Sequence, residues 1–218
     1  MKNEPSLLRG SGKMQVLIVD DHPVILSGCR AMLSPYSDIE VIDALDSTLA
    51  YDKYVETRPD VAVIDVNLPG TSGFALTRRI LDFDPQARII IFTMNDDPIF
   101  AARAIENGAK GYIGKCEDPA RFVTAIRAVA TGQTFLLPEM AQKLAFLDPG
   151  RRDFLTGLNA RELEILRLLR SGKSMAEIAG IINVSYKTVA NSCAVLKRKL
   201  GARTPLDLVR IAVENKLA

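Results

Sequence analysis

The sequence has no tryptophan, a single histidine and three cysteines, and it contains no long uninterrupted apolar run. A membrane-spanning helix needs about 20 such residues, so the sequence predicts no membrane segment. The first 13 residues also lack the apolar core of a signal peptide, which predicts a cytoplasmic protein. Cys29, Cys116 and Cys193 are far apart and odd in number, a pattern that predicts neither a disulfide framework nor a zinc site. The lone His22 excludes a metal centre made of several histidines.

The charge of the chain is unevenly distributed along its 218 residues. Residues 151–218 carry 13 lysines and arginines against 6 acidic residues, whereas residues 1–150 carry 15 against 20. A basic C-terminal part attached to an acidic body indicates a polyanionic partner for one part only. The length allows one large domain or two small ones, each with its own core.

The N-terminal part alternates short apolar runs with amphipathic segments. The apolar runs lie at 16–19, 40–42, 61–64, 89–92 and 111–113, and the amphipathic segments at 23–33, 47–57, 73–81, 98–107 and 119–131. Five alternations of strand and helix predict a doubly wound, flavodoxin-like α/β domain with a five-stranded parallel sheet. Asp118 is the expected N-cap of the last helix and Gly132 closes it.

Strand signals disappear after residue 156, where an all-α domain is expected. Asn159 and Ser174 each precede a glutamate by three residues, which is the pattern of a capping box before a helix. Ser185 and Thr204 are the expected N-caps of two further helices. We therefore expect an N-terminal tail at 1–13, an α/β domain at 14–135, a linker at 136–155 and a four-helix domain at 156–218.

Polar side chains follow four of the five expected strands. The first strand ends at Asp20 and Asp21, the third strand at Asp65 and the fourth strand at Thr93. Lys115 follows the fifth strand. Ligands of an open parallel sheet bind beyond the carboxyl ends of its strands, so we expect these side chains to meet at one edge.

This set of side chains has a defined chemistry. Three neighbouring carboxylates repel each other unless a cation is present, and Mg²⁺ suits a site with few protein oxygen ligands. A lysine and a hydroxyl are suitable partners for a phosphoryl group. These residues therefore predict a site that carries a phosphoryl group on a carboxylate, with Asp65 as the nucleophile.

The segments VLIVDDHP, VIDVNLPGTSG, IIIFTMNDDP and GAKGYIGK resemble, in order, those of bacterial two-component receiver domains. The resemblance implies that Asp65 accepts a phosphoryl group from a sensor histidine kinase. It implies that Mg²⁺ is held by Asp20 or Asp21 together with Asp65 and the backbone carbonyl of Asn67.

The same resemblance makes Lys115 a phosphate contact and makes Thr93 and Tyr112 a switch pair. In that mechanism, Thr93 moves to a phosphoryl oxygen and Tyr112 turns from outside to inside. The surface beside Tyr112 then changes shape, which allows pairing with a second subunit or release of the basic domain.

Residues 156–218 resemble the helix-turn-helix domain of LuxR/FixJ-type regulators, through LNARELEILRLLRSGKSMAEIAGIINVSYKTVANSCAVLKRKLGA. Helical spacing turns Val189, Cys193, Leu196 and Leu200 inward, so Cys193 is interpreted as a core thiol. The candidate DNA-contacting residues are Lys187, Thr188, Ala190, Asn191, Ala194, Lys197 and Arg198. Asn191 is expected to pair with adenine, and the basic residues at 197–199 with phosphates.

The sequence thus predicts a regulator that is not an enzyme and that binds promoter DNA, as a homodimer when phosphorylated. One alternative is an aspartate-nucleophile phosphatase, although such enzymes place a second acid where this chain has Asn67. The other alternative is an orphan regulator that keeps the pocket without using phosphorylation as its signal.

Overall fold

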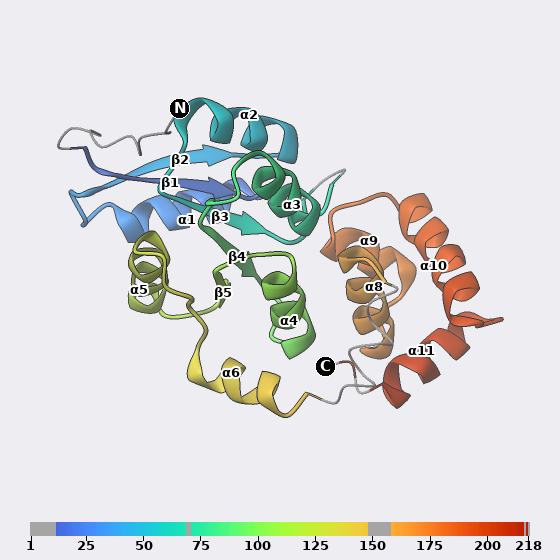
Figure 1. Cartoon of the computed structure of the whole chain (residues 1–218). Helices are drawn as coiled ribbons and strands as arrows, with labels where there is room; N and C mark the ends of the chain where they lie inside the picture. The colour runs from blue at the N-terminus through green and yellow to red at the C-terminus, as the bar shows by residue number, and fades with distance from the viewer. Residues whose placement is uncertain (1–11, 69–70, 148–157, 216, 218) are drawn as a thin grey trace, which may run out of the picture.

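A computed structural model of the chain describes residues 12–68, 71–147, 158–215 and 217. Its sheet contains the five expected strands, all parallel, in the order β2-β1-β3-β4-β5 (Figure 1). The strands are β1 (Met14–Val19), β2 (Ile39–Ala44), β3 (Val61–Asp65), β4 (Ile89–Thr93) and β5 (Gly111–Gly114). Every residue of the neighbouring strands β3 and β4 is buried, as the continuous apolar runs predicted.

Five helices cover the two faces of the sheet. They are α1 (Pro23–Leu33), α2 (Ser47–Thr57), α3 (Gly73–Phe83), α4 (Pro98–Glu106) and α5 (Pro119–Ala130). Alternate strand residues divide between two cores: Val16 and Ile18 pack with α1 and α5, whereas Leu17 and Val19 pack on the side of α2, α3 and α4. The predicted flavodoxin-like fold is therefore confirmed.

The expected helix ends are also present in this domain. The Asp118 side chain accepts a hydrogen bond from the N–H of Ala120 at the start of α5. Gly132, just past the end of the same helix, has φ 85°, a conformation that favours glycine. None of the helices in the described ranges combines the length and hydrophobicity needed to cross a bilayer.

The segment expected as a linker begins with ordered structure. Phe135 forms a parallel bridge with Gly111, so the backbone covers the free edge of β5. Helix α6 (Pro138–Ala145) follows and packs beside α4, with Met140 and Leu144 against the core. The sequence had not predicted a helix here. The turn at 148–150 and the arginine pair at 151–152 lie outside the described residues, as does the predicted tail up to residue 11.

The C-terminal domain consists of α8 (Ala160–Arg170), α9 (Met175–Ile181), α10 (Tyr186–Leu200) and α11 (Pro205–Glu214). Both predicted capping boxes form, at Asn159 with Glu162 and at Ser174 with Glu177. Each box bonds otherwise unsatisfied backbone N–H groups at a helix start, which explains why these short helices begin where they do. The four-helix prediction is confirmed for the described residues 158–215.

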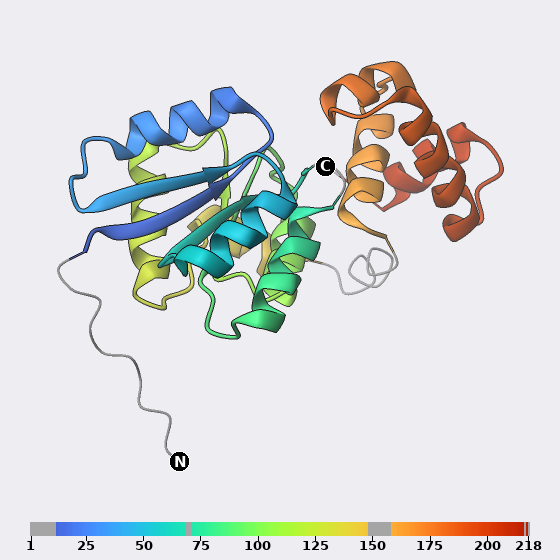
Figure 2. The same ribbon diagram turned by 90° about the horizontal axis from the view of Figure 1, so that it is seen from above.

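The two domains contact each other through α8 and α9, which lie toward the sheet domain, while α10 and α11 lie on the outer side (Figures 1 and 2). Arg161 of α8 donates a hydrogen bond to the carbonyl of Leu68 (3.2 Å), and Asn183, after α9, donates one to Asp21 (3.2 Å). We refer to this placement of the two domains as the closed arrangement.

Candidate functional site

Acidic and basic side chains meet at the carboxyl edge of the sheet. The Nζ of Lys115 lies 2.6 Å from Oδ2 of Asp20 and 3.0 Å from Oδ2 of Asp65. The side chains of Asp20, Asp65 and Lys115 are each at most 5% exposed. The convergence expected from the strand ends is therefore confirmed for these three residues.

The backbone of α3 approaches the end of β3 so closely that only glycine fits there. A Cβ atom at Gly73 would lie 1.9 Å from the carbonyl oxygen of Asp65, far inside van der Waals contact. The Gly73 N–H donates to the carbonyl of Val66 at 2.8 Å, which holds this approach in place. The glycine of the TSG sequence thus positions the loop that follows Asp65, a role that the sequence analysis did not assign.

Burial and charge set the protonation of this site. Burial raises the pKa of Asp65 to about 6, and the Asp20 charge adds to the increase while the Lys115 ammonium opposes it. Burial lowers the pKa of Lys115, but the charges of Asp65 and Asp20 outweigh burial and leave that pKa above its ordinary value. The lysine is therefore a fixed positive charge between two carboxylates, and a phosphoryl group on Asp65 would find it in place.

A cluster of possible metal ligands lies next to this ion pair. Ligand atoms of Asp20, Asp21 and His22 lie within 4.8 Å of one another. The Nδ1 of His22 is 2.8 Å from Asp21 Oδ1 and 3.1 Å from Asp20 Oδ1. Oδ2 of Asp20, beside Lys115, and Oδ1 of Asp21, beside His22, are both buried, and carboxylate oxygens of this kind suit a hard divalent cation.

The inward and outward faces predicted for α10 have the burial expected from helical spacing. Val189, Cys193 and Leu196 are buried, which confirms the inward face and the interpretation of Cys193 as a core thiol. On the opposite side, exposed or half-buried, lie Lys187, Thr188, Ala190, Asn191, Ala194, Lys197 and Arg198. The N–H of Thr188 donates to Ser185 Oγ (3.1 Å) at the helix start.

Comparisons with known proteins agree with both halves of this description. A family model for the response regulator receiver domain matches residues 16–127, and one for bacterial regulatory proteins of the luxR family matches residues 156–212. Over 214 residues the chain is 36% identical to the oxygen regulatory protein NreC of Staphylococcus carnosus, covering 94% of this chain and 99% of that protein. The chain is a LuxR-family response regulator.

Solved structures show the same relationship. A LuxR-family two-component response regulator from Aurantimonas is 41% identical, with a TM-score of 0.59, over 62% of this chain and 96% of that one. RcsB of Salmonella enterica, bound to a promoter in the presence of phosphomimetic BeF₃⁻, is 27% identical with a TM-score of 0.60. The match covers 91% of this chain and 98% of that one. As a family member, this regulator controls transcription in a phosphorylation-dependent manner.

In this regulator the DNA-binding domain covers the acidic site of the receiver. Asp65 and Lys115 share a cavity of about 420 Å³ with Glu164 and Arg167 of α8. Asn95, in the loop after β4, donates from Nδ2 to Glu164 Oε2 at 2.6 Å, and Arg167 bonds the other oxygen at 2.8 Å. Asn95 and Glu164 are both only 5% exposed. The sequence analysis missed Glu164, because a single acid within a helix of the second domain gives no signal of its partner.

The switch pair differs from the expectation in one respect. Tyr112 is only 3% exposed, so its ring is already inside in this structure and does not start outside. Its hydroxyl donates to the backbone carbonyl of Asn95 (2.8 Å), an acceptor that makes burial of the ring favourable. The N–H of Asn95 donates to Thr93 Oγ1 at 3.2 Å. Thr93 and Tyr112 are therefore connected through Asn95.

Proposed function

We propose that Asp65 is the phosphoacceptor and that a sensor histidine kinase is its donor. The observation that carries this assignment is the contact of Lys115 with both Asp20 and Asp65 at the sheet edge. An oxygen of the Asp65 carboxylate attacks phosphorus, the P–N bond to the donor imidazole breaks, and the imidazole nitrogen keeps the electron pair. Lys115 then binds a phosphoryl oxygen in place of the carboxylate.

Asp20, Asp21 and Asp65, with the backbone carbonyl of Asn67, are the proposed ligands of Mg²⁺. When bound, the ion neutralises charge on the phosphoryl group and the surrounding carboxylates. Such a reaction takes place in the cytoplasm, where the kinase domain and promoter DNA are both accessible.

The experiment is phosphorylation of the full-length protein with Mg²⁺ and acetyl phosphate. We expect one base-labile acyl phosphate, found at Asp65 by mass spectrometry and absent from Asp65→Asn. Equal labelling of Asp65→Asn would exclude the assignment. Labelling without any change in DNA affinity would favour an orphan regulator. Rapid turnover of a phosphomonoester would favour the phosphatase alternative.

For the DNA-binding domain, we propose that α10 enters the major groove of promoter DNA. The exposed face of the helix, from Lys187 to Arg198, combines a base-reading amide at Asn191 with positive charge near its C-terminal end. One four-helix domain makes a small interface, so we propose a homodimer on paired half-sites when the protein is phosphorylated. A relative, RcsB, has been solved as two dimers bound to two parallel DNAs.

The link between the two activities is proposed to run through Asn95. When the Thr93 hydroxyl turns to a phosphoryl oxygen, it no longer accepts from the Asn95 N–H. The loop that carries Asn95 then moves, and the hydrogen bond from its side chain to Glu164 is lost. Glu164 and its partner Arg167 both line the cavity that contains Asp65, so the added negative charge repels one and attracts the other. Loss of the Asn95–Glu164 hydrogen bond is therefore the effect that favours separation of the DNA-binding domain from the receiver.

A further inference from the structure

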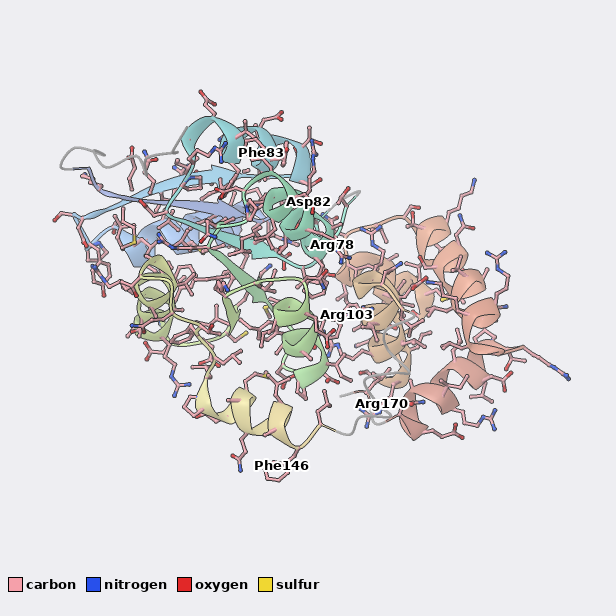
Figure 3. The ribbon with its side chains drawn as sticks, in the orientation of Figure 1. Arg78, Asp82, Phe83, Arg103, Phe146 and Arg170 are labelled. Atoms are coloured by element: carbon pink, nitrogen blue, oxygen red, sulfur yellow. The ribbon has the colours of Figure 1, made fainter. Side chains whose placement is uncertain are left out.

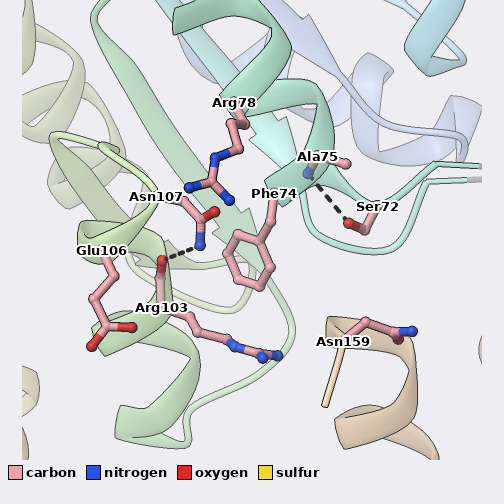
Figure 4. A pocket seen from close by; sticks show the side chains of 8 residues that line it. All are labelled: Ser72, Phe74, Ala75, Arg78, Arg103, Glu106, Asn107 and Asn159. Carbon is pink, nitrogen blue, oxygen red and sulfur yellow. Dashed lines mark hydrogen bonds between the residues drawn. The ribbon is translucent and has the colours of Figure 1, made fainter. Parts of the chain in front are cut away.

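A second cavity lies between the domains, away from the phosphoacceptor pocket. It has a volume of about 410 Å³ and is lined by α3, α4 and the start of α8 (Figure 4). Arg78 of α3 and Arg103 of α4 both lie on the receiver surface that faces the DNA-binding domain (Figure 3). We call this cavity the arginine groove.

The charges in the arginine groove are mostly positive. Among the described residues Arg78 forms no ion pair, although Asp82 lies one helical turn further on. Figure 4 shows that its guanidinium extends toward Asn107 and the Phe74 ring. Glu106 also lines the groove, but it is exposed and its carboxylate points away from Phe74 (Figure 4).

Arg103 contributes a second, partly desolvated guanidinium. It donates a hydrogen bond to the carbonyl of Leu158 in the DNA-binding domain, which fixes its direction across the groove. Burial lowers the pKa of Arg103, against the opposing effect of Glu106 and Glu162. Arg103 therefore places a second positive charge at the wall of the groove.

We propose that the arginine groove binds a small organic phosphate. Its phosphate lies between Arg78 and Arg103, because two guanidinium groups match a doubly charged head group with several acceptor oxygens. Its apolar or planar part lies against Phe74, and the amides of Asn107 and Asn159 supply hydrogen bonds at the rim. The volume is in the range of small-ligand sites, which begins at about 300 Å³.

The groove has one wall on each domain, and this gives the ligand a regulatory effect. Asn159 caps α8, whereas Arg78, Phe74 and Arg103 belong to the receiver. A ligand that contacts both walls binds better to the closed arrangement than to an open one, and therefore shifts the population toward the closed arrangement. The organic phosphate thus acts against phosphorylation of Asp65, a role that rests on the proposed function.

The binding test uses isothermal titration calorimetry of the full-length protein at constant ionic strength. The probes are adenosine 5′-monophosphate and ribose 5-phosphate, with adenosine as the uncharged comparison. We expect one molecule of each phosphate to bind and adenosine to fail. Arg78→Gln should weaken binding at least tenfold. The matched control is Arg79→Gln, an equal charge change at the next residue, whose guanidinium lies 3.6 Å from the centre of the Tyr51 ring and outside the groove.

Two results would overturn the site: no binding of either phosphate, or equal weakening by Arg78→Gln and Arg79→Gln. Binding that depends on Arg78 supports the site whatever the outcome of phosphorylation experiments at Asp65. The coupling test is a DNA titration with the tighter-binding phosphate at ten times its Kd. Apparent DNA affinity should fall by up to about tenfold for wild type and not for Arg78→Gln. Unchanged DNA affinity of the ligand-saturated wild type would overturn the regulatory role.

Discussion

The contact between Asn95 and Glu164 allows a direct test of domain coupling. In Asn95→Asp the side chain keeps Oδ1, which accepts a hydrogen bond from the N–H of Asp97 at 3.2 Å, so the loop retains its local turn. The substitution removes the Nδ2 donor that lies 2.6 Å from Glu164 and places a second carboxylate beside it. It therefore mimics the loss of contact that we propose for phosphorylation.

The magnitude follows from the burial and charge of this contact. A hydrogen bond to a charged group contributes about 1.5–3 kcal/mol, and both partners here are only 5% exposed. Losing that amount shifts the equilibrium between closed and open arrangements about 10- to 150-fold, and repulsion between the two carboxylates adds to the shift. Arg167, which pairs with Glu164 at 2.8 Å, limits but does not cancel the repulsion.

The assay is fluorescence anisotropy with a promoter fragment, with and without acetyl phosphate. Asn95→Asp should bind DNA without the phosphodonor at least tenfold more tightly than wild type, and should gain little on phosphorylation. The matched control is Asn107→Asp, an equal charge change at an asparagine whose Nδ2 bonds the carbonyl of Arg103 in its own helix. If Asn95→Asp and Asn107→Asp both bind as wild type does, the Asn95–Glu164 contact does not hold the closed arrangement and this reasoning fails.

Three further outcomes are expected. Asn191→Ala should cost about 1–3 kcal/mol on the specific DNA site and little on random DNA, as measured by competitive titration; equal losses on both would mean that no base is read. Lys197→Ala should weaken binding to all sequences and reduce the slope of log K against log salt by about one, and an unchanged slope would argue against a phosphate contact. Iodoacetamide should modify exposed Cys116 in the folded protein and spare Cys29, where burial raises the thiol pKa to about 12; mass spectrometry of the alkylated peptides decides this.

The fold could be predicted from local signals because each of them has a short-range physical cause. Continuous apolar runs such as 61–64 need burial on both faces, and capping residues such as Asn159 bond the N–H groups of their own helix. Helix α6 was missed because Met140 and Leu144 provide only two apolar contacts in eight residues, and its position depends on packing beside α4.

Only those residues of the candidate site that follow parallel strands could be predicted from the sequence. The carboxyl ends of parallel strands share an edge, so Asp20, Asp65 and Lys115 had to lie close together. The inward position of the Tyr112 ring depends instead on a hydrogen-bond acceptor, the backbone carbonyl of Asn95. The buried position of the Glu164 side chain depends on a hydrogen bond from Asn95, which is 69 residues away in the sequence. Sequence spacing carries no information on such pairs, since each residue alone has the pattern of an ordinary loop or surface residue.

The interdomain hydrogen bonds explain how one phosphoryl group could release a whole domain. Three of them involve receiver residues at or within three positions of the proposed site: Asp21 bonds Asn183, Leu68 bonds Arg161 and Asn95 bonds Glu164. Reversing a 99:1 preference requires about 5.5 kcal/mol, more than one hydrogen bond supplies. In the proposed mechanism, metal binding at Asp21 disturbs the first of these bonds. Movement of the loop after Asp65 disturbs the second, and movement of the loop after Thr93 disturbs the third. Acting together, they reach that magnitude, whereas a change confined to Tyr112, which is already buried, does not.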